Sequence, residues 1–217
     1  MSEPLKSAPL LQAIGLSCER DDRLLFQSLD FSIVPGSLTR VEGANGSGKT
    51  TLLRILAGLH DGFEGQVLWQ GQPLIADRET FLRNLLFMGH RPGVKPLLTP
   101  LENLRFLISG RQRVTDDQLS EALSRAGLAG FEDVSCQHLS AGQTRRVALA
   151  RLLLSDEPLW ILDEAFTAID QQGVEGLEQL LVNRAAMGGA IILTTHHEPE
   201  LPGMDRLCLG QGGGREF

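Results

Sequence analysis

The chain has 217 residues, 20 of them basic and 27 acidic, which gives a formal net charge of −7. This length predicts a single domain over residues 1–217. Apolar residues make up 42% of the chain, which is enough to form a core and excludes a disordered acidic chain. The negative balance argues against a protein that grips nucleic acid through a basic face. No stretch approaches the roughly 18 apolar residues of a membrane span, and residues 1–6 lack the charged-then-apolar order of an export signal.

Strand patterns dominate the first part of the chain. Residues 10–17 and 24–34 show the alternation of apolar and polar side chains that is typical of half-buried strands. After a Pro-Gly turn, a short strand at 37–42 runs into a glycine-rich loop, and residues 49–58 predict a helix that ends at a glycine. A further strand is predicted at 66–69.

Helical patterns replace strands in the middle of the chain. From about residue 95 to 155 apolar residues recur at helical spacing, and Thr115 with Gln118 fits a capping box. Solid apolar runs at 159–162 and 190–194 then predict parallel strands that are buried on both faces. We therefore expect an α/β core with a helical subdomain, about residues 88–155, inserted in it, and a disordered tail at 210–217.

The cysteines are expected to be structural. Cys18, Cys136 and Cys208 lie far apart and show no metal-ligand spacing. An odd number of cysteines without a paired motif predicts buried, reduced thiols in a cytosolic protein.

The strongest motif is the glycine-rich loop itself, which has the form GxxxxGK[ST] between a predicted strand and a predicted helix. Glycines let backbone N–H groups converge on phosphate oxygens, and the helix N-terminus adds a favourable dipole. Lys49 is expected to bridge the β- and γ-phosphates of a nucleotide, and the Thr50 hydroxyl to bind Mg²⁺. An ordinary glycine-rich turn is the alternative, which the flanking pattern disfavours. The expected nucleotide contacts are Gly43, Ala44, Asn45, Gly46, Ser47, Gly48, Lys49, Thr50 and Thr51.

An acidic pair, Asp163 and Glu164, follows the apolar run 159–162. A carboxylate at the C-terminal end of a parallel strand lies beside a phosphate loop in α/β folds. Asp163 is therefore predicted to hold Mg²⁺, and Glu164 to accept a proton from the attacking water or to orient it. The alternative is a pair of solvated carboxylates that opens a loop.

A further helix is predicted to begin at Ser140, because Ser140 and Gln143 have the capping-box spacing. The free N–H groups of its first turn form a possible second anion site. Physical arguments alone favour the simpler interpretation, a well-capped amphipathic helix with a basic face.

Together these motifs resemble those of ABC ATPases. Residues 139–143 are similar to the family signature LSGGQ, with Ala141 for its first glycine, and stand between the phosphate loop and the acidic pair as in the family. Residues 167–170 resemble the D-loop and His196 the switch histidine, so the resemblance extends over about residues 24–209. It implies an α/β fold of the P-loop NTPase class: an ABC-type nucleotide-binding domain with an antiparallel β subdomain and an inserted α-helical subdomain.

The resemblance also implies a catalytic arrangement. Two copies of the chain would form an ATP-dependent homodimer that sandwiches two ATP molecules with Mg²⁺. Each ATP would lie between the phosphate loop of one copy and Ser140, Gly142 and Gln143 of the other. Asp170 would contribute to nucleotide binding, and His196 would act with Glu164 and Lys49 in catalysis.

Three positions depart from the family pattern, and one of them is Ala165, where the family commonly has a proline after the acidic pair. The glutamine that the family places where the sheet meets the helical subdomain falls on His90, which is expected to contact the γ-phosphate or the Mg²⁺ site. The aromatic residue that often stacks on adenine falls on Arg20. A planar guanidinium can stack on a base, and a surface arginine in a loop is the equal alternative.

Four segments resemble one particular group within this family. Residues 89–95, 98–104, 159–170 and 193–196 are similar to the ATP-binding subunits of bacterial haem exporters that act in cytochrome c maturation. This implies integral membrane subunits as partners and a peripheral place on the cytoplasmic face of the inner membrane. The alternatives are an exporter of another substrate, or a soluble ABC ATPase that acts on nucleic acid or ribosomes. Soluble ABC ATPases typically carry two cassettes or a long coiled coil. A further alternative is a P-loop kinase, but kinases have no use for the helix that begins at Ser140.

Overall fold

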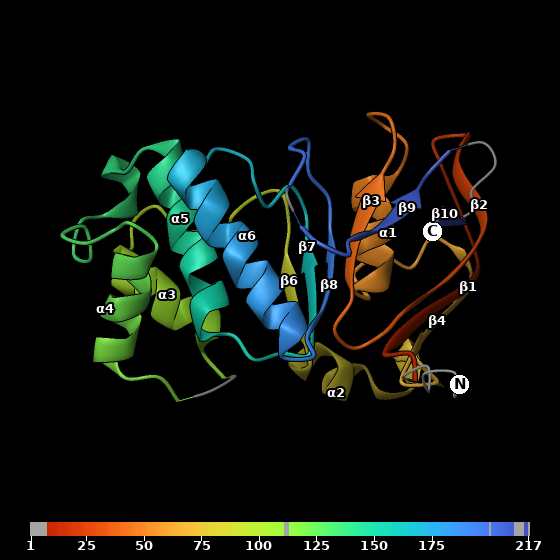
Figure 1. The fold of residues 1–217 in the computed structure, drawn as a ribbon, viewed down its shortest axis with the longest axis horizontal. Coiled ribbons are helices and arrows are strands. Elements are labelled where there is room, and N and C mark those ends of the chain that lie inside the picture. The colour runs from red at the N-terminus through yellow and green to blue at the C-terminus, as the bar shows by residue number, and fades with distance from the viewer. Residues whose placement is uncertain (1–7, 111–112, 200, 211–214, 217) are drawn as a thin grey trace. The chain divides into compact units, whose positions relative to one another are not determined.

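The computed structural model describes residues 8–110, 113–199, 201–210 and 215–216 (Figure 1). They form two compact units. The first comprises residues 1–88, 157–165 and 181–217 and contains the sheets, and the second comprises residues 89–156 and 166–180 and is helical.

An antiparallel sheet forms one layer of the first unit. Its strands are β1 (Leu11–Arg20), β2 (Arg23–Ile33), β4 (Glu64–Trp69) and β5 (Gln72–Pro73), in the order β2-β1-β4-β5. The turn between β1 and β2 consists of Asp21 and Asp22, both with positive φ (53° and 57°). Two left-handed residues in a two-residue loop match the twist of a hairpin, so β1 and β2 extend further than their alternation predicts.

A mostly parallel sheet forms the other layer, in the order β10-β9-β3-β8-β7-β6. The parallel strands are β3 (Leu38–Glu42), β6 (Leu85–Met88), β7 (Leu159–Leu162), β8 (Ala190–Leu193) and β9 (Asp205–Cys208). Every residue of β7 and β8 is buried, as their apolar runs predict. The carboxyl ends of β3, β8, β7 and β6 therefore meet at one edge of the sheet, where α/β folds place their ligands.

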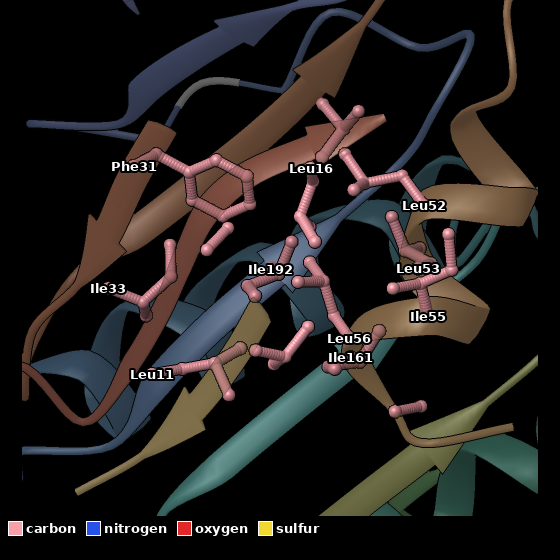
Figure 2. Close-up of a cluster of buried hydrophobic side chains, with 14 of the residues drawn as sticks. Leu11, Leu16, Phe31, Ile33, Leu52, Leu53, Ile55, Leu56, Ile161 and Ile192 are labelled. Atoms are coloured by element: carbon pink, nitrogen blue, oxygen red, sulfur yellow. The ribbon is translucent and has the colours of Figure 1, made fainter. Parts of the chain in front are cut away.

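Helix α1 (Lys49–Leu56) joins the two sheets into one core. Its buried side chains, Leu52, Leu53, Ile55 and Leu56, belong to the same cluster as side chains of β1, β2, β7 and β8, which Figure 2 shows converging. A 3₁₀ turn, η1 (Leu74–Asp77), and the short α2 (Arg78–Arg83) precede β6. This packing fixes the first turn of α1, and with it the phosphate loop, against the sheet edge.

The second unit contains α3 (Pro100–Ile108), α4 (Asp116–Arg125), α5 (Ala141–Ala150), and the 3₁₀ turns η2 (Cys136–His138) and η3 (Arg151–Leu154). The predicted capping boxes at Thr115 and Ser140 are confirmed, and Thr99 forms a third. Leu104, Leu119 and Val147 contribute one side chain from each long helix to a separate core. The helical character predicted for this part of the chain is confirmed.

Several of the described elements have no counterpart among the predicted ones, including α2, β9 and α6 (Gln171–Ala186). Of the tail that is expected to be disordered, residues 211–214 and 217 lie outside the described residues, whereas Arg215–Glu216 form β10 and pair with β9. No helix in the described ranges is long and apolar enough to cross a lipid bilayer.

The cysteines are free thiols, as predicted. Burial raises the pKa of Cys18 and of Cys136, which keeps both in the unreactive thiol form. Cys208 corrects the prediction of burial, because it lies at the end of β9 and is only half-buried.

Candidate functional site

The glycine-rich loop connects β3 to α1, and two of its glycines are required by geometry. A Cβ atom on Gly43 would lie 2.5 Å from Ser47 Oγ and 2.9 Å from the carbonyl oxygen of Leu209. Gly48 caps α1 with φ of 96°, a left-handed conformation that other residues rarely adopt. Lys49 Nζ donates to the carbonyl oxygens of Gly43 (2.7 Å) and Ala44 (3.2 Å), so the ammonium group lies over the loop.

Asp163 stands directly after β7 and is buried. One of its carboxylate oxygens, Oδ2, accepts a hydrogen bond from Thr50 Oγ1 (2.9 Å), and Oδ1 accepts one from Thr194 Oγ1 (2.7 Å). The structure thus brings together two of the three residues that were predicted for the Mg²⁺ site, Thr50 and Asp163, across 113 positions of sequence.

This donor set fits a hard divalent cation, since a hydroxyl and a carboxylate supply oxygen ligands. Within the described ranges no group of three or more His, Cys, Asp or Glu side chains converges. In nucleotide sites Mg²⁺ is usually held by one or two protein ligands together with phosphates and water, and the pair of oxygen donors on Thr50 and Asp163 fits that arrangement.

Glu164 and His196 lie next to each other. His196 Nε2 is 3.4 Å from Glu164 Oε1, and the Glu164 side chain is only 14% exposed. Glu164 has a left-handed backbone, with φ of 56°, and its N–H donates to Thr194 Oγ1 (2.9 Å). Strained backbone of this kind persists only where its surroundings hold it, and it is frequent at functional sites. Thr194 belongs to the segment 193–196 that carries part of the resemblance, but no motif in the sequence assigns it a role at the site.

The signature residues lie in the second unit, at the start of α5. Ser140 Oγ accepts from the N–H of Gln143 (3.2 Å), and Gln143 Oε1 accepts from the N–H of Ser140 (2.9 Å). A Cβ atom on Gly142 would lie 3.1 Å from the carbonyl oxygen of Ala168. The D-loop therefore passes close to the first turn of α5, and only a glycine fits there without displacement.

Asp170 is engaged within the same unit. Its Oδ1 accepts from the N–H of Gly173 (3.0 Å), and its Oδ2 pairs with Arg146 of α5 (2.5 Å). The bond from Gly173, followed by that from Arg146, holds the pKa of the Asp170 carboxyl below its usual range. Asp170 thus fixes the start of α6 against α5, a role that the sequence does not reveal.

His90 and Arg20, which both depart from the family pattern, lie in different settings. His90 follows β6 by two residues, and its carbonyl oxygen accepts a hydrogen bond from Nη1 of the buried Arg145 (3.3 Å). The segment after β6 is thereby tied to the signature helix. Arg20 is the last residue of β1; its side chain is 70% exposed, and its Nε lies 3.3 Å from Asp21 Oδ2.

A group of charged residues lies near the histidine segment, residues 196–198, and has no counterpart among the motifs. Arg40, a buried residue of β3, donates to both carboxylate oxygens of Glu198 (2.6 and 3.0 Å). Glu42 pairs with Arg40 (3.4 Å) and with Arg206 (3.3 Å). Because Glu198 follows His196 by two residues, this network ties the histidine segment to β3.

Replacing Glu198 by glutamine is expected to change how stability depends on pH. The hydrogen bonds from Arg40 are the main reason that the pKa of the Glu198 carboxyl is lowered. A pKa that is lower in the folded state gives stability that is present above the unfolded value, about 4.3 for glutamate, and lost as pH falls below it. Thermal unfolding should therefore separate Glu198→Gln from wild type at neutral pH, and the two curves should converge as pH falls from about 4.3 through the lowered pKa of Glu198.

The control for this prediction is Glu175→Gln, on the exposed side of α6. The thermal unfolding of Glu175→Gln should follow that of wild type from neutral to acid pH. A difference between Glu198→Gln and wild type that stays constant from neutral to acid pH would contradict the assignment.

Comparison with known proteins was made for both sequence and fold. A family model described as ABC transporter matches residues 26–167. A protein of Hahella chejuensis named "Cytochrome c biogenesis ATP-binding export protein CcmA" is 53% identical over 203 residues, which cover 93% of this chain and 96% of that protein. Relatives with the same name in Yersinia pestis (54% over 189 residues, 87% of each protein) and Vibrio cholerae (52% over 204 residues, 93% and 99%) are equally similar.

The fold has close counterparts among solved structures. An ATP-binding subunit of an ABC transporter superposes with a TM-score of 0.82 at 24% identity, over 95% of this chain and 90% of that one. A dimeric ATP-binding cassette in a post-hydrolysis state, bound to ADP and Pi, superposes with a TM-score of 0.78 at 22% identity, over 94% and 98%.

Proposed function

The chain belongs to the ABC transporter family and is an ABC-type ATPase, and from this premise we propose that it drives a membrane complex that exports haem, or releases a haem-loaded chaperone, in cytochrome c biogenesis. Relatives that are more than half identical over nearly the whole chain carry the name of an export protein of that process. The ATPase fold class predicted from the motifs is confirmed. The observation that carries the chemistry is the meeting of Thr50, Asp163 and Glu164 at one sheet edge.

Each residue at this edge has a distinct task in ATP hydrolysis. Lys49 and the N–H groups at the start of α1 bind phosphate oxygens, and Thr50 with Asp163 holds Mg²⁺. When bound, Mg²⁺ neutralises charge on the β- and γ-phosphate oxygens. Glu164 takes a proton from the attacking water. His196, whose Nε2 lies 3.4 Å from the Glu164 carboxylate, holds that carboxylate in place and contacts the γ-phosphate.

The second half of each site is proposed to come from another copy of the chain. The capped start of α5 contains the exposed Ser140 and the half-buried Gly142 and Gln143, and a helix N-terminus favours an anion. A dimeric arrangement is known for a cassette of the same fold. Asp170 supports this surface by holding the start of α6 to α5.

Arg20 is proposed to stack on the adenine ring. Its exposure leaves the guanidinium available, and a planar cation stacks on a base much as an aromatic ring does. Arg20→Ala should weaken ATP affinity several-fold, by about 1 kcal/mol or more, with unchanged thermal stability. Equilibrium titration with ATP and with an inorganic triphosphate distinguishes binding of the adenine ring from binding of the phosphates. The affinity for ATP should fall, and the affinity for the triphosphate should not. Equal ATP affinity in both proteins would leave Arg20 as a surface residue.

His90 is proposed to take the place of the family glutamine near the γ-phosphate and Mg²⁺. A neutral imidazole offers one acceptor and one donor, the same pair of functions that an amide offers. The hydrogen bond from Arg145 to its backbone supports a link between this position and the signature helix. His90→Gln should retain stimulation of ATPase activity by membrane partners and His90→Ala should lose it; similar stimulation in His90→Ala would exclude the role.

The partners are proposed to be integral membrane subunits that resemble CcmB and CcmC, with this chain bound peripherally at the cytoplasmic face of the bacterial inner membrane. The test is purification of the tagged chain from membranes in mild detergent, followed by identification of the bound proteins and by assay of haem transfer in the complex. If the chain is recovered together with the membrane subunits of a different exporter, the proposal that the complex acts on haem is wrong.

A further inference from the structure

We infer that Thr194 is a positioning residue for ATP hydrolysis, whose single hydroxyl group sets the directions of both Asp163 and Glu164. The inference rests on the ATPase activity alone and is independent of what the complex exports.

The hydroxyl of Thr194 lies at the centre of the acidic pair. Thr194 is the first residue after β8 and is completely buried. Its Oγ1 donates to Asp163 Oδ1 (2.7 Å) and accepts from the N–H of Glu164 (2.9 Å). A hydroxyl has one proton to give, so the bond to Asp163 uses that proton and leaves the lone pairs for Glu164.

Its effect on Asp163 is orientation. With Oδ1 held by Thr194, the plane of the carboxylate is fixed, and Oδ2 faces Thr50 Oγ1 at 2.9 Å. Hydrogen bonds to an ionised oxygen are strong and directional. Without the hydroxyl, Oδ1 loses this hydrogen bond, and the carboxylate is held less firmly in the orientation that brings the two oxygen ligands proposed for Mg²⁺ to one place.

Its effect on Glu164 acts through the backbone. Glu164 has φ of 56°, which is unfavourable for a residue with a side chain, and the bond from its N–H to Thr194 holds this conformation. The conformation directs the carboxylate towards His196. Loss of the bond removes one reason for the peptide to stay left-handed, and the proton-accepting oxygen shifts from its place beside the attacking water.

The neighbouring threonine supplies a matched control. Thr195 is also buried, and its Oγ1 accepts from the N–H of His197 (2.9 Å), a contact within its own segment. Thr194→Val and Thr195→Val therefore remove the same group from adjacent buried positions, and only the first removes a bond to the acidic pair.

The test uses the purified full chain without partners. Thr194→Val should lower kcat by about 10- to 100-fold, because small misplacement of reacting groups costs that much, and it should raise the KM for ATP with Mg²⁺, because Asp163 is no longer oriented. Thr194→Ser keeps the hydroxyl and should restore kcat to within about threefold of wild type. Thr195→Val should resemble wild type. If Thr194→Val keeps wild-type kcat, or if Thr194→Ser is as slow as Thr194→Val, the inference is wrong.

A second measurement does not depend on turnover. Affinity for a non-hydrolysable ATP analogue is measured with Mg²⁺ and with chelator, at a temperature where thermal unfolding shows each variant to be folded. Thr194→Val should match wild type in chelator and lose most of the gain in affinity that Mg²⁺ gives, since Asp163 is no longer oriented. An equal gain in both proteins would overturn the effect on Asp163.

Discussion

Glu164→Gln is expected to bind ATP as wild type does and to hydrolyse it roughly 10²- to 10⁴-fold more slowly, because a positioned general base contributes about that much. Glutamine has the shape of glutamate and can hydrogen-bond to water, but it does not accept the proton. The backbone bond from residue 164 to Thr194 does not involve the side chain, so the strained conformation and the Asp163 contacts should persist.

Because ATP then stays intact, an ATP-bound dimer should accumulate. Gel filtration with and without ATP and Mg²⁺ measures this as a shift from monomer to dimer in Glu164→Gln. Glu175→Gln, which removes a carboxylate from the surface of α6, is the control and should show wild-type turnover and no dimer. Turnover near the wild-type rate in Glu164→Gln would remove Glu164 from the mechanism.

Lys49→Ala is expected to abolish measurable ATP turnover and to weaken ATP binding by at least about tenfold, because it removes a cation that bonds directly to phosphate oxygens. The fold should survive, since within the described residues the ammonium group donates to the carbonyl oxygens of Gly43 and Ala44 in the loop and does not belong to the apolar core. Titration with a fluorescent ATP analogue gives the affinity, and thermal unfolding reports on the fold.

Arg54→Ala is the matched control for Lys49→Ala. Arg54 is a cation on the exposed side of the same helix, α1, so the net charge changes equally while the phosphate loop is untouched. Affinity should fall only for Lys49→Ala. Unchanged affinity together with full activity in Lys49→Ala would contradict the assignment of the phosphate loop.

The sequence by itself determined the local features of this protein. The phosphate loop is a contiguous motif whose glycines supply local backbone conformations, such as the φ of 96° at Gly48. The capping boxes at Thr115 and Ser140 are signals between residues three positions apart. The apolar runs of β7 and β8 predict burial on both faces because no polar residue interrupts them. Signals of this kind can be read because their physical cause lies within a few residues.

Elements with weak local signals were not predicted from the sequence. Helix α6 contains Gly173 and Gly176, which disfavour a helix, and its start is held instead by Asp170 and Arg146. Strand β9 is only four residues long, and its place is set by parallel pairing with β3. In both cases partners elsewhere in the chain supply the stability that the segment itself lacks.

Only the tertiary structure decided how the acidic pair is held. Thr50 and Asp163 meet across 113 positions, and Thr194 reaches Asp163 across 31. Arg40 reaches Glu198 across 158. The order of the parallel strands brings these residues to one edge, and no pattern in the sequence records which side chains will be within hydrogen-bonding distance there. A threonine after an apolar run looks like any other until the fold places its hydroxyl between two carboxylate-bearing residues.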